Sequence, residues 1–400
     1  MKYNYTVVFL LVFSLAKIFC LANHDASKPV LLIVGTRPEG IKMLPIYHAL
    51  KKYNIPTIVC STGQHGAMLD EVFNLFDAVP DKALNIMIPG QDLFHITTAV
   101  LSHMKDFLQE INPSLVLVQG DTTTAVAAAL ASFYLKIPVG HIEAGLRSGN
   151  IMAPYPEEMN RRIISIIATY HFAPTQLSVE NLKKENITQQ IFCVGNTVVD
   201  ALHAIREKIV AQRIMPSHSL QNLIHSCKEK KQKIMLLTAH RRESFSEGLK
   251  NIFTAIKITL EKNPDLFIIY PMHPNPAIKR IYEEAQLRSL SNISVTSPLA
   301  YSDLVYLLDN VDFVATDSGG IQEEAVSLGK PVLILRNETD RPEGIGCGIA
   351  QLTGTNTQAV VQGISHIIQT PVMQFEKNNV YGDGTASEQI AHIIKNILIS

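Results

Sequence analysis

From Lys28 onward, short apolar runs alternate with segments of helical periodicity. Eleven of these runs are typical of buried strands, at residues 29–34, 57–61, 114–119, 138–142, 170–173, 191–194, 233–238, 266–270, 293–296, 313–316 and 332–335. Continuous apolar strands that alternate with helices indicate parallel sheets covered on both faces. Eleven strands exceed one ordinary sheet. We therefore predict an α/β chain with two Rossmann-like, doubly wound domains and a cleft between them.

The chain has 400 residues, which is enough for two domains of this kind. We place the boundary just after Gly195-Asn196, where a long helical stretch and then a polar segment, 216–233, precede the next strand. The expected units are an N-terminal domain at 28–197 and a C-terminal domain at 198–385. The last helix, 386–400, is expected to pack back on the N-terminal domain.

Residues 1–27 form a hydrophobic leader or extension. Lys2 precedes an apolar run, and Cys20 and Ala22 make a small-x-small pair, as in a signal peptide. The run is short for a membrane-spanning helix. The alternatives are a secretory signal, an uncleaved membrane anchor and an extension without consequence.

Composition excludes several classes of protein. The net charge is −1 and like charges form no block, so we expect no nucleic-acid partner. Five widely spaced cysteines, without metal-ligand spacing, predict reduced thiols and no metal site. The chain has neither a GxGxxG fingerprint nor a P-loop, so we expect no nicotinamide or ATP cofactor.

Polar residues follow the predicted strands of the first half, where ligands of open parallel sheets bind. Residues 35–39 (GTRPE) open a helix at which Arg37 and Lys42 would attract phosphate, although both would suit an ordinary surface turn. Residues 120–124 (GDTTT) follow the next central strand. An N-cap role alone would account for Asp121.

Two further segments of the first half carry carboxylates. In GHIEAGLR (140–147), His141 and Glu143 would share one face of a strand, and an unpaired charge buried there would be costly. In PYPEEMNRR (154–162), Glu157 suits the first turn of a helix and an i,i+4 pair with Arg161. The sharper hypothesis is that Glu157 is a second carboxylate facing Glu143.

The second half offers histidines and a glycine turn. His240 ends a strand directly before two arginines, and His273 ends the following strand. In TDSGGIQEEA (316–325), two glycines would let a diphosphate approach backbone N–H groups. Glu324 lies further along that helix, where it would accept hydrogen bonds from ribose hydroxyls. Arg341, after the next strand, would neutralise phosphate charge.

Taken in order, these motifs resemble one family. The set comprises GTRPE-IK, QH--MLD, LNIM-PGQ, GDTTT, GH-EAGLR, PEE-NR, GNTV-DAL, HRRES, YP-H-NP, TDSGGIQEEA, LGKPVL, RPE and YGDG. From Lys28 to the C-terminus the chain is similar to the non-hydrolysing UDP-N-acetylglucosamine 2-epimerases, which share the GT-B fold with many glycosyltransferases. The resemblance implies interconversion of UDP-N-acetylglucosamine (UDP-GlcNAc) and UDP-N-acetylmannosamine (UDP-ManNAc) without a cofactor, in a homodimer.

The resemblance also implies roles for individual residues. The implied nucleotide-sugar contacts are Arg37, Lys42, Asp121, Glu143, His240, Ser318, Gly319, Gly320, Glu324 and Arg341. The implied catalytic residues are Asp121, Glu143, Glu157 and His240. Bacterial members of the family often hold a second, allosteric UDP-GlcNAc, for which Gln64 and His273 match. Gly66-Ala67 departs from the longer polar residues usual at that site, and Leu304 replaces a common aromatic residue near the uracil.

For the reaction, we hypothesise elimination of UDP to 2-acetamidoglucal, followed by re-addition with the proton delivered to the opposite face. The alternatives are a hydrolysing 2-epimerase that releases N-acetylmannosamine and UDP, a GT-B glycosyltransferase, and a UDP-sugar sensor without activity. Because UDP-sugars are made and used in the cytoplasm, the substrate predicts a cytoplasmic enzyme. The leader, by contrast, favours a secretory or membrane-anchored one.

Overall fold

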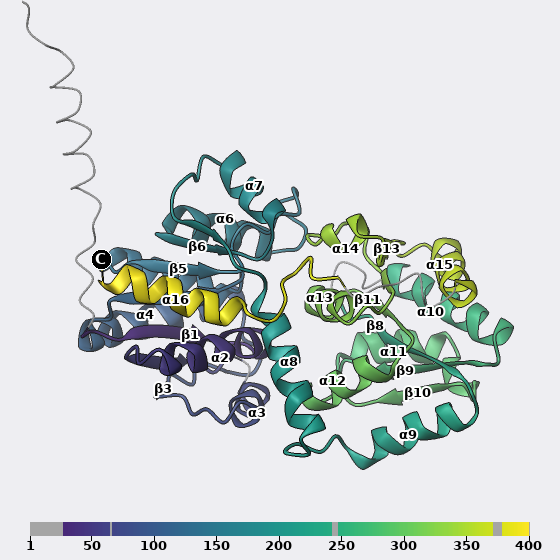
Figure 1. Cartoon of the computed structure of the whole chain (residues 1–400). Coiled ribbons are helices and arrows are strands. Elements are labelled where there is room, and N and C mark those ends of the chain that lie inside the picture. The colour runs from purple at the N-terminus through teal and green to yellow at the C-terminus, as the bar shows by residue number, and fades with distance from the viewer. Residues whose placement is uncertain (1–26, 65, 242–246, 371–377, 400) are drawn as a thin grey trace, which may run out of the picture.

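The computed structural model describes residues 27–64, 66–241, 247–370 and 378–399, which form two parallel sheets with helices around them (Figure 1). Apart from Ser27, the predicted leader lies outside the described residues, so its alternatives stay predictions. Within the described ranges, no helix has both the length and the apolar character needed to cross a bilayer.

The first sheet has seven parallel strands in the order β3-β2-β1-β4-β5-β6-β7. Its strands are β1 (Val30–Val34), β2 (Thr57–Ser61), β3 (Lys82–Ala83), β4 (Leu115–Gln119), β5 (Val139–Ile142), β6 (Tyr170–Ala173) and β7 (Ile191–Cys193). Its helices are α2 (Arg37–Lys52), α3 (Ala67–Leu75), α4 (Leu93–Ile111), α5 (Thr123–Tyr134), α6 (Glu157–Ile167) and α7 (Gln176–Lys184). The direction of winding reverses between β1 and β4, so a ligand crevice is expected beyond their carboxyl ends.

The second sheet has six parallel strands in the order β10-β9-β8-β11-β12-β13. They are β8 (Lys233–Thr238), β9 (Leu266–Pro271), β10 (Ile293–Thr296), β11 (Phe313–Thr316), β12 (Val332–Ile334) and β13 (Ala350–Leu352). The helices are α9 (His218–Glu229), α10 (Glu247–Lys262), α11 (Pro276–Glu284), the 3₁₀ turn η2 (Leu287–Ser289), α12 (Tyr301–Asn310), α13 (Gly319–Ser327), α14 (Glu343–Gly346) and α15 (Thr357–Gln369). Here the winding reverses between β8 and β11. We call the two sheets with their helices the first and second lobes.

Two helices join the lobes. Helix α8 (Thr197–Val210) packs against α2 of the first lobe and against α12 and α13 of the second. Helix α16 (Ala386–Ile399) returns to the first lobe and packs on α2 and α8 (Figure 1). The carboxylate of Asp200 on α8 accepts hydrogen bonds from the first backbone N–H groups of α16, at 3.3 Å from Ala386 and 2.7 Å from Ser387. One cluster of buried apolar side chains runs from β1 through α8 to β8 and β11.

The predicted α/β class with two doubly wound sheets is confirmed. All eleven predicted strands are present, with ends within one residue of the prediction. Strands β3 and β13 were not predicted, because β3 has two exposed residues and β13 exposes two of its three. Helix α9 occupies a segment predicted only as polar, since one narrow apolar side, with Leu220, Ile224 and Cys227, is buried.

Candidate active site

The first lobe's switch point opens with the N-terminus of α2. Thr36 is the N-cap, and the Glu39 carboxylate completes a capping box by accepting from the N–H groups of Gly35 (3.0 Å) and Thr36 (2.6 Å). Its other oxygen accepts from the hydroxyl of Thr122 at 2.6 Å. Glu39 is therefore occupied in holding the strand ends of β1 and β4 together. Arg37, in the first turn, lines the cavity between the lobes.

Glu143 stands immediately beyond β5 and is buried. Its Oε2 accepts from Lys42 Nζ at 2.5 Å and from the amide of Gln119, and its Oε1 accepts from Asn196 Nδ2 and Arg341 Nη2, both at 3.1 Å. Burial acts to raise the pKa of Glu143, but the charges of Lys42 and Arg341 outweigh it and hold the pKa below its usual value. Glu143 is therefore a fixed, ionised group.

The prediction that His141 and Glu143 share one face of a strand is wrong. The strand ends at Ile142, and Glu143 has φ +65°, a left-handed conformation that breaks the alternation of side chains. His141 Nε2 instead lies 2.7 Å from the carbonyl oxygen of Gly120. Burial lowers the pKa of His141 to about 3, so the ring is neutral and packs inside the sheet.

Asp121 does not cap the helix that follows it, contrary to the simpler hypothesis. Thr122 takes that position, and its hydroxyl accepts from the N–H of Ala125 at 3.0 Å. The carboxylate of Asp121 accepts instead from the guanidinium of Arg161, with Nε at 3.0 Å. The predicted pair of Glu157 with Arg161 is wrong as well, since the ion pairs of Arg161 are with Asp121, Glu158 and Asp340.

Glu157 differs from Glu143 in having an uncommitted carboxyl. Its Oε2 is buried without a hydrogen-bond partner among the described residues, and Arg241 Nη1 lies 4.0 Å from Oε1. Burial, followed by the negative charge of Asp121, raises the pKa of Glu157 above its usual value. A carboxyl whose pKa is raised by burial and by a neighbouring carboxylate is suited to exchanging protons with a substrate.

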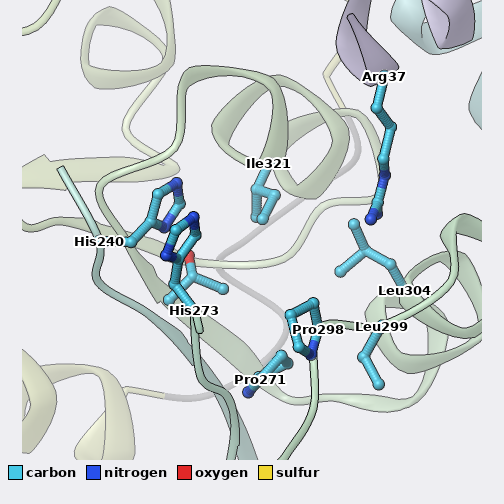
Figure 2. A pocket seen from close by; sticks show the side chains of 9 residues that line it. Arg37, His240, Pro271, His273, Pro298, Leu299, Leu304 and Ile321 are labelled. Carbon is cyan, nitrogen blue, oxygen red and sulfur yellow. The ribbon is translucent and has the colours of Figure 1, made fainter. Parts of the chain in front are cut away.

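The second lobe's switch point is organised by Asp317, which follows β11 and is fully buried. Its Oδ2 accepts from the N–H groups of His240 (2.5 Å) and Arg241 (2.7 Å), and its Oδ1 lies 3.3 Å from His240 Nδ1. His273 stacks on His240 with ring centroids 5.6 Å apart and planes 8° apart (Figure 2). Burial, and then the charge of His240, lowers the pKa of His273.

The N-terminus of α13 lies next to this pair. Ser318 occupies the N-cap position, but its hydroxyl makes no capping bond. The N–H groups of the first helical turn have no partners within a helix, so they suit an anion. A Cβ atom at Gly319 would collide with the guanidinium of Arg341, whereas one at Gly320 would meet nothing within 4 Å. A side chain at Gly319 would therefore force the Arg341 guanidinium to move, while Gly320 leaves its backbone open.

A cavity of about 130 Å³ lies beside these groups (Figure 2). Its lining is largely apolar and comprises Arg37, Thr238, His240, Pro271, His273, Pro298, Leu299, Leu304 and Ile321. Figure 2 shows Arg37 reaching from the first lobe toward Leu304, while the stacked histidines form the opposite wall. Both lobes therefore contribute to the cavity.

Glu324 lies one turn beyond Ile321 on α13 and is buried. The hydroxyl of Tyr301 donates to its Oε1 at 2.7 Å. Burial raises the pKa of Glu324 to about 7, against the opposing effects of that hydrogen bond and of the charges of Lys42 and Arg37. A carboxyl with a pKa near 7 is suited to giving up the hydrogen bond from Tyr301 and accepting from ligand hydroxyls instead.

The structure joins some of the predicted site residues by direct contacts. Lys42, Glu143 and Arg341 form one chain of ion pairs across the lobes. The two residues matched to an allosteric site are not joined by any contact among the described residues: Gln64 accepts from the hydroxyl of Thr124 at 2.7 Å, and His273 stacks on His240. The described ranges hold no cluster of three or more His, Cys, Asp or Glu residues suited to a metal ion.

Several residues of this network were not singled out from the sequence. They are Gln119, Asn196, Asp317, Glu323 and Asp340. Two of them carried a usable signal, because Asp317 and Asp340 are acidic residues directly before predicted phosphate-binding positions. Gln119 ends an apolar strand and Glu323 lies within a helix, so neither carried a signal, and Asn196 is the N-cap of α8, where it marked only the predicted domain boundary.

Two facing Rossmann-like sheets, with carboxylates beyond one and a glycine-opened helix beyond the other, define a two-domain α/β enzyme of the GT-B-like class. The family model described as "UDP-N-acetylglucosamine 2-epimerase" matches residues 48–395. A UDP-N-acetylglucosamine 2-epimerase of Campylobacter jejuni is 45% identical over 374 residues, which cover 92% of this chain and 97% of that protein. The chain belongs to the UDP-N-acetylglucosamine 2-epimerase family.

Solved structures agree with this assignment. The UDP-GlcNAc 2-epimerase from Neisseria meningitidis, bound to UDP-GlcNAc, has a TM-score of 0.86 at 42% identity and covers 92% of this chain and 100% of its own. The enzyme from Methanocaldococcus jannaschii, in complex with UDP-GlcNAc and UDP, has a TM-score of 0.80 at 33% identity, with 92% and 99% covered. The whole two-lobed architecture is therefore shared.

Proposed function

We propose that this chain interconverts UDP-GlcNAc and UDP-ManNAc by inverting C2 of the sugar, without net hydrolysis. The observation that carries the proposal is the position of Arg341. Its guanidinium packs against Gly319 at the N-terminus of α13 and also donates to Glu143 of the first lobe at 3.1 Å. A group suited to phosphate is therefore in contact with the carboxylates of the first lobe, as one nucleotide sugar requires.

The second lobe holds the nucleotide in this proposal. The apolar cavity beside the stacked histidines takes the uracil. The diphosphate sits at the open N-terminus of α13, where Ser318, Gly319 and Gly320 offer N–H groups and a hydroxyl. Arg341, Arg37 and His240 add positive charge or hydrogen bonds around it. Glu324 accepts from the ribose hydroxyls, releasing the hydroxyl of Tyr301.

The first lobe performs the chemistry. The hydrogen on C2 is poorly acidic, because its neighbour is an amide nitrogen and not a carbonyl. Cleavage of the bond from C1 to the diphosphate comes first, since the ring oxygen stabilises the resulting cationic centre. Loss of the C2 proton then gives 2-acetamidoglucal and UDP. Re-addition of UDP to C1, with a proton delivered to the other face of C2, gives the epimer.

The carboxylates divide this work according to their surroundings. Glu143 accepts from four donors and stays ionised, so we assign it to holding Lys42 and Arg341 against the developing charge. Asp121 and Glu157 interact through their charges, and Glu157 carries the raised pKa. We assign proton exchange at the two faces of C2 to this pair, because inversion requires two acid–base groups. His240 is fixed by Asp317 and assists the departing diphosphate.

The architecture goes with this function. We propose that residues 28–197, together with the helix at 386–400, form the catalytic domain and that 198–385 form the UDP-binding domain. We also propose a homodimer, as the family resemblance implies, and action in the cytoplasm, where UDP-sugars are made. The positions of Gln64 and His273 leave allosteric control as a separate proposal, testable by the dependence of rate on substrate concentration.

The decisive experiment is incubation of the purified chain with UDP-GlcNAc in deuterated water. We expect UDP-ManNAc with deuterium at C2, and deuterium in the recovered UDP-GlcNAc, with UDP retained in both. Free N-acetylmannosamine with stoichiometric UDP would identify a hydrolysing epimerase. Unchanged, unlabelled substrate would exclude epimerisation and favour a glycosyltransferase awaiting an acceptor, or a sensor.

A further inference from the structure

Among the described residues, Asp340 has the most arginine partners of any carboxylate in the inter-lobe network, and it has no role in the proposed chemistry. It lies between β12 and α14 and is buried. Three guanidinium groups surround it: Arg341 Nη1 at 2.7 Å and Arg336 Nη1 at 3.4 Å from Oδ1, and Arg161 Nη2 at 2.9 Å from Oδ2. Despite its burial, these charges hold the pKa of Asp340 well below its usual range.

Two of these arginines lead to the candidate catalytic carboxylates. Arg161, on α6 of the first lobe, donates to Asp121 as well as to Asp340. Arg341 donates to Glu143 as well as to Asp340. Asp340 is therefore one arginine away from each carboxylate, and the alternating charges run without a gap from Asp121 to Glu143.

The contact between Arg161 and Asp340 also crosses the lobes. The two residues are 179 positions apart in the chain, and each belongs to a different sheet's set of helices and loops. The pair can form only when the lobes meet. Closing without Asp340 would bring the guanidinium groups of Arg161 and Arg341 together with no anion between them, which is costly in a buried site.

We infer that Asp340 is a positioning residue that makes the orientation of Asp121 depend on closure of the lobes, acting through Arg161. When the second lobe arrives with bound nucleotide, Asp340 accepts from Nη2 of Arg161 and fixes the guanidinium, which then holds Asp121 at the sugar through Nε and Nη2. The inference rests on the proposed function. It explains why the second lobe carries an acid beside its phosphate-binding arginine.

The test compares Asp340→Asn with a matched inter-lobe control. Glu343 accepts from the hydroxyl of Thr175 across the lobes at 2.5 Å and contacts none of the candidate catalytic groups. Asp340→Asn should lower kcat by about 100-fold, the scale of a misplaced reacting group, with the Kd for UDP changed less than about threefold. Because the lobes close incompletely, some turnovers should release free 2-acetamidoglucal and UDP. Glu343→Gln should keep kcat within about threefold and release none.

The coupling between Asp340 and Arg161 is measured by the kcat of the double variant. If Asp340 only stabilised the fold, this coupling would be absent. Arg161→Lys should lower kcat by itself, and the double variant with Asp340→Asn should be little worse than the more damaged single variant. Asp340→Glu, which keeps the charge, should recover most of the lost kcat. Should Asp340→Asn fail to fold, the Arg161→Lys and Asp340→Glu variants carry the same comparison.

Three results would overturn the inference: a kcat for Asp340→Asn within about twofold of wild type, additive losses in the double variant, or the same glucal release from Glu343→Gln. Failure of the proposed function is distinct from each of these. In that case the wild-type chain itself would leave UDP-GlcNAc unlabelled in deuterated water.

Discussion

The two lobes have the same strand order around the switch point, yet they present different chemistry there. Beyond β1, β4 and β5 the first lobe presents Lys42, Asp121 and Glu143, all charged side chains. Beyond β8 and β11 the second lobe presents a helix N-terminus and an apolar cavity. The fold therefore supplies a crevice, and the few residues that follow each strand decide what the crevice does.

A second difference lies within the first lobe. Glu143 is held by four donors and its pKa is lowered, whereas Glu157 has a buried oxygen that no described residue contacts by a hydrogen bond, and its pKa is raised. The same side chain thus serves as a fixed charge at one position and as a proton carrier at the other. Each comparison can be tested by substitution.

The largest effect is expected for Glu157→Gln. The amide cannot exchange a proton, so kcat should fall by about 10²–10⁴-fold. The Kd for UDP should be unchanged, because Glu157 lies on the lobe opposite the nucleotide. Steady-state rates and calorimetric titration with UDP would check this. A loss of UDP affinity equal to the loss of kcat would contradict the division of work between the lobes.

The next effect concerns the glycines of the second lobe. Gly319→Ala places a methyl group against the Arg341 guanidinium even in the free protein, so Arg341 must shift away from Glu143. UDP affinity and kcat should both fall, by about 10–100-fold. Gly320→Ala is the matched control, because its methyl group meets nothing until a ligand is bound. It should weaken UDP binding while leaving the melting temperature unchanged; equal melting temperatures for both variants would contradict the packing argument.

A smaller effect, on stability, is expected for Glu324. In the folded protein its pKa is raised to about 7. The folded state therefore binds more protons than the unfolded state between the ordinary Glu pKa and pH 7, and stability falls as pH rises through that window. Glu324→Gln removes this loss, so at pH 8 the variant should be more stable than wild type by about 1–3 kcal/mol. At pH 5 the two should be nearly equal.

Thermal unfolding at the two pH values measures this difference, and UDP titration supplies the counterpart. The substitution should weaken UDP binding at pH 8 if the carboxylate holds the ribose. A variant that is no more stable than wild type at pH 8 would show that the ionised Glu324 side chain does not destabilise the folded protein.

The smallest effect is expected in the cavity. Leu304 lines it, and none of the described residues that line it is Phe, Tyr or Trp. Leu304→Phe should add a stacking surface for the base and tighten UDP binding by about 3–10-fold, with kcat little changed. Unchanged affinity would place the base elsewhere. The pyrimidine-free ligand inorganic diphosphate is the control, since its affinity should not respond.

The fold was predictable because the strands are short runs dominated by apolar residues, such as VLLIV in β1 and LFIIYP in β9, and a run of this kind is recognised without knowledge of distant residues. The site was predictable in part, because strand ends locate a crevice. The ion pairs and hydrogen bonds within the site were not predictable from the sequence. The rule for helical neighbours pairs Arg161 with Glu157, whereas the guanidinium turns inward to Asp121 and to Asp340, 179 residues away.

The role of Asp121 was obscured in the same manner. Local capping chemistry gives it an ordinary task, but Thr122 next to it performs that task and leaves the carboxylate available. Likewise, the alternation of a strand does not reveal that Glu143 adopts a left-handed backbone. Where two local rules compete for neighbouring residues, only the packed structure decides between them.

The apolar cluster that passes through α8 from one sheet to the other has a consequence for motion. Pulling the lobes apart would expose this apolar cluster to water. The crevice must therefore open by rotation of the lobes around α8, with the cluster still buried. Neither half of the chain, produced alone, would cover its share of that surface. Heating should accordingly melt the molecule in a single cooperative transition and not lobe by lobe.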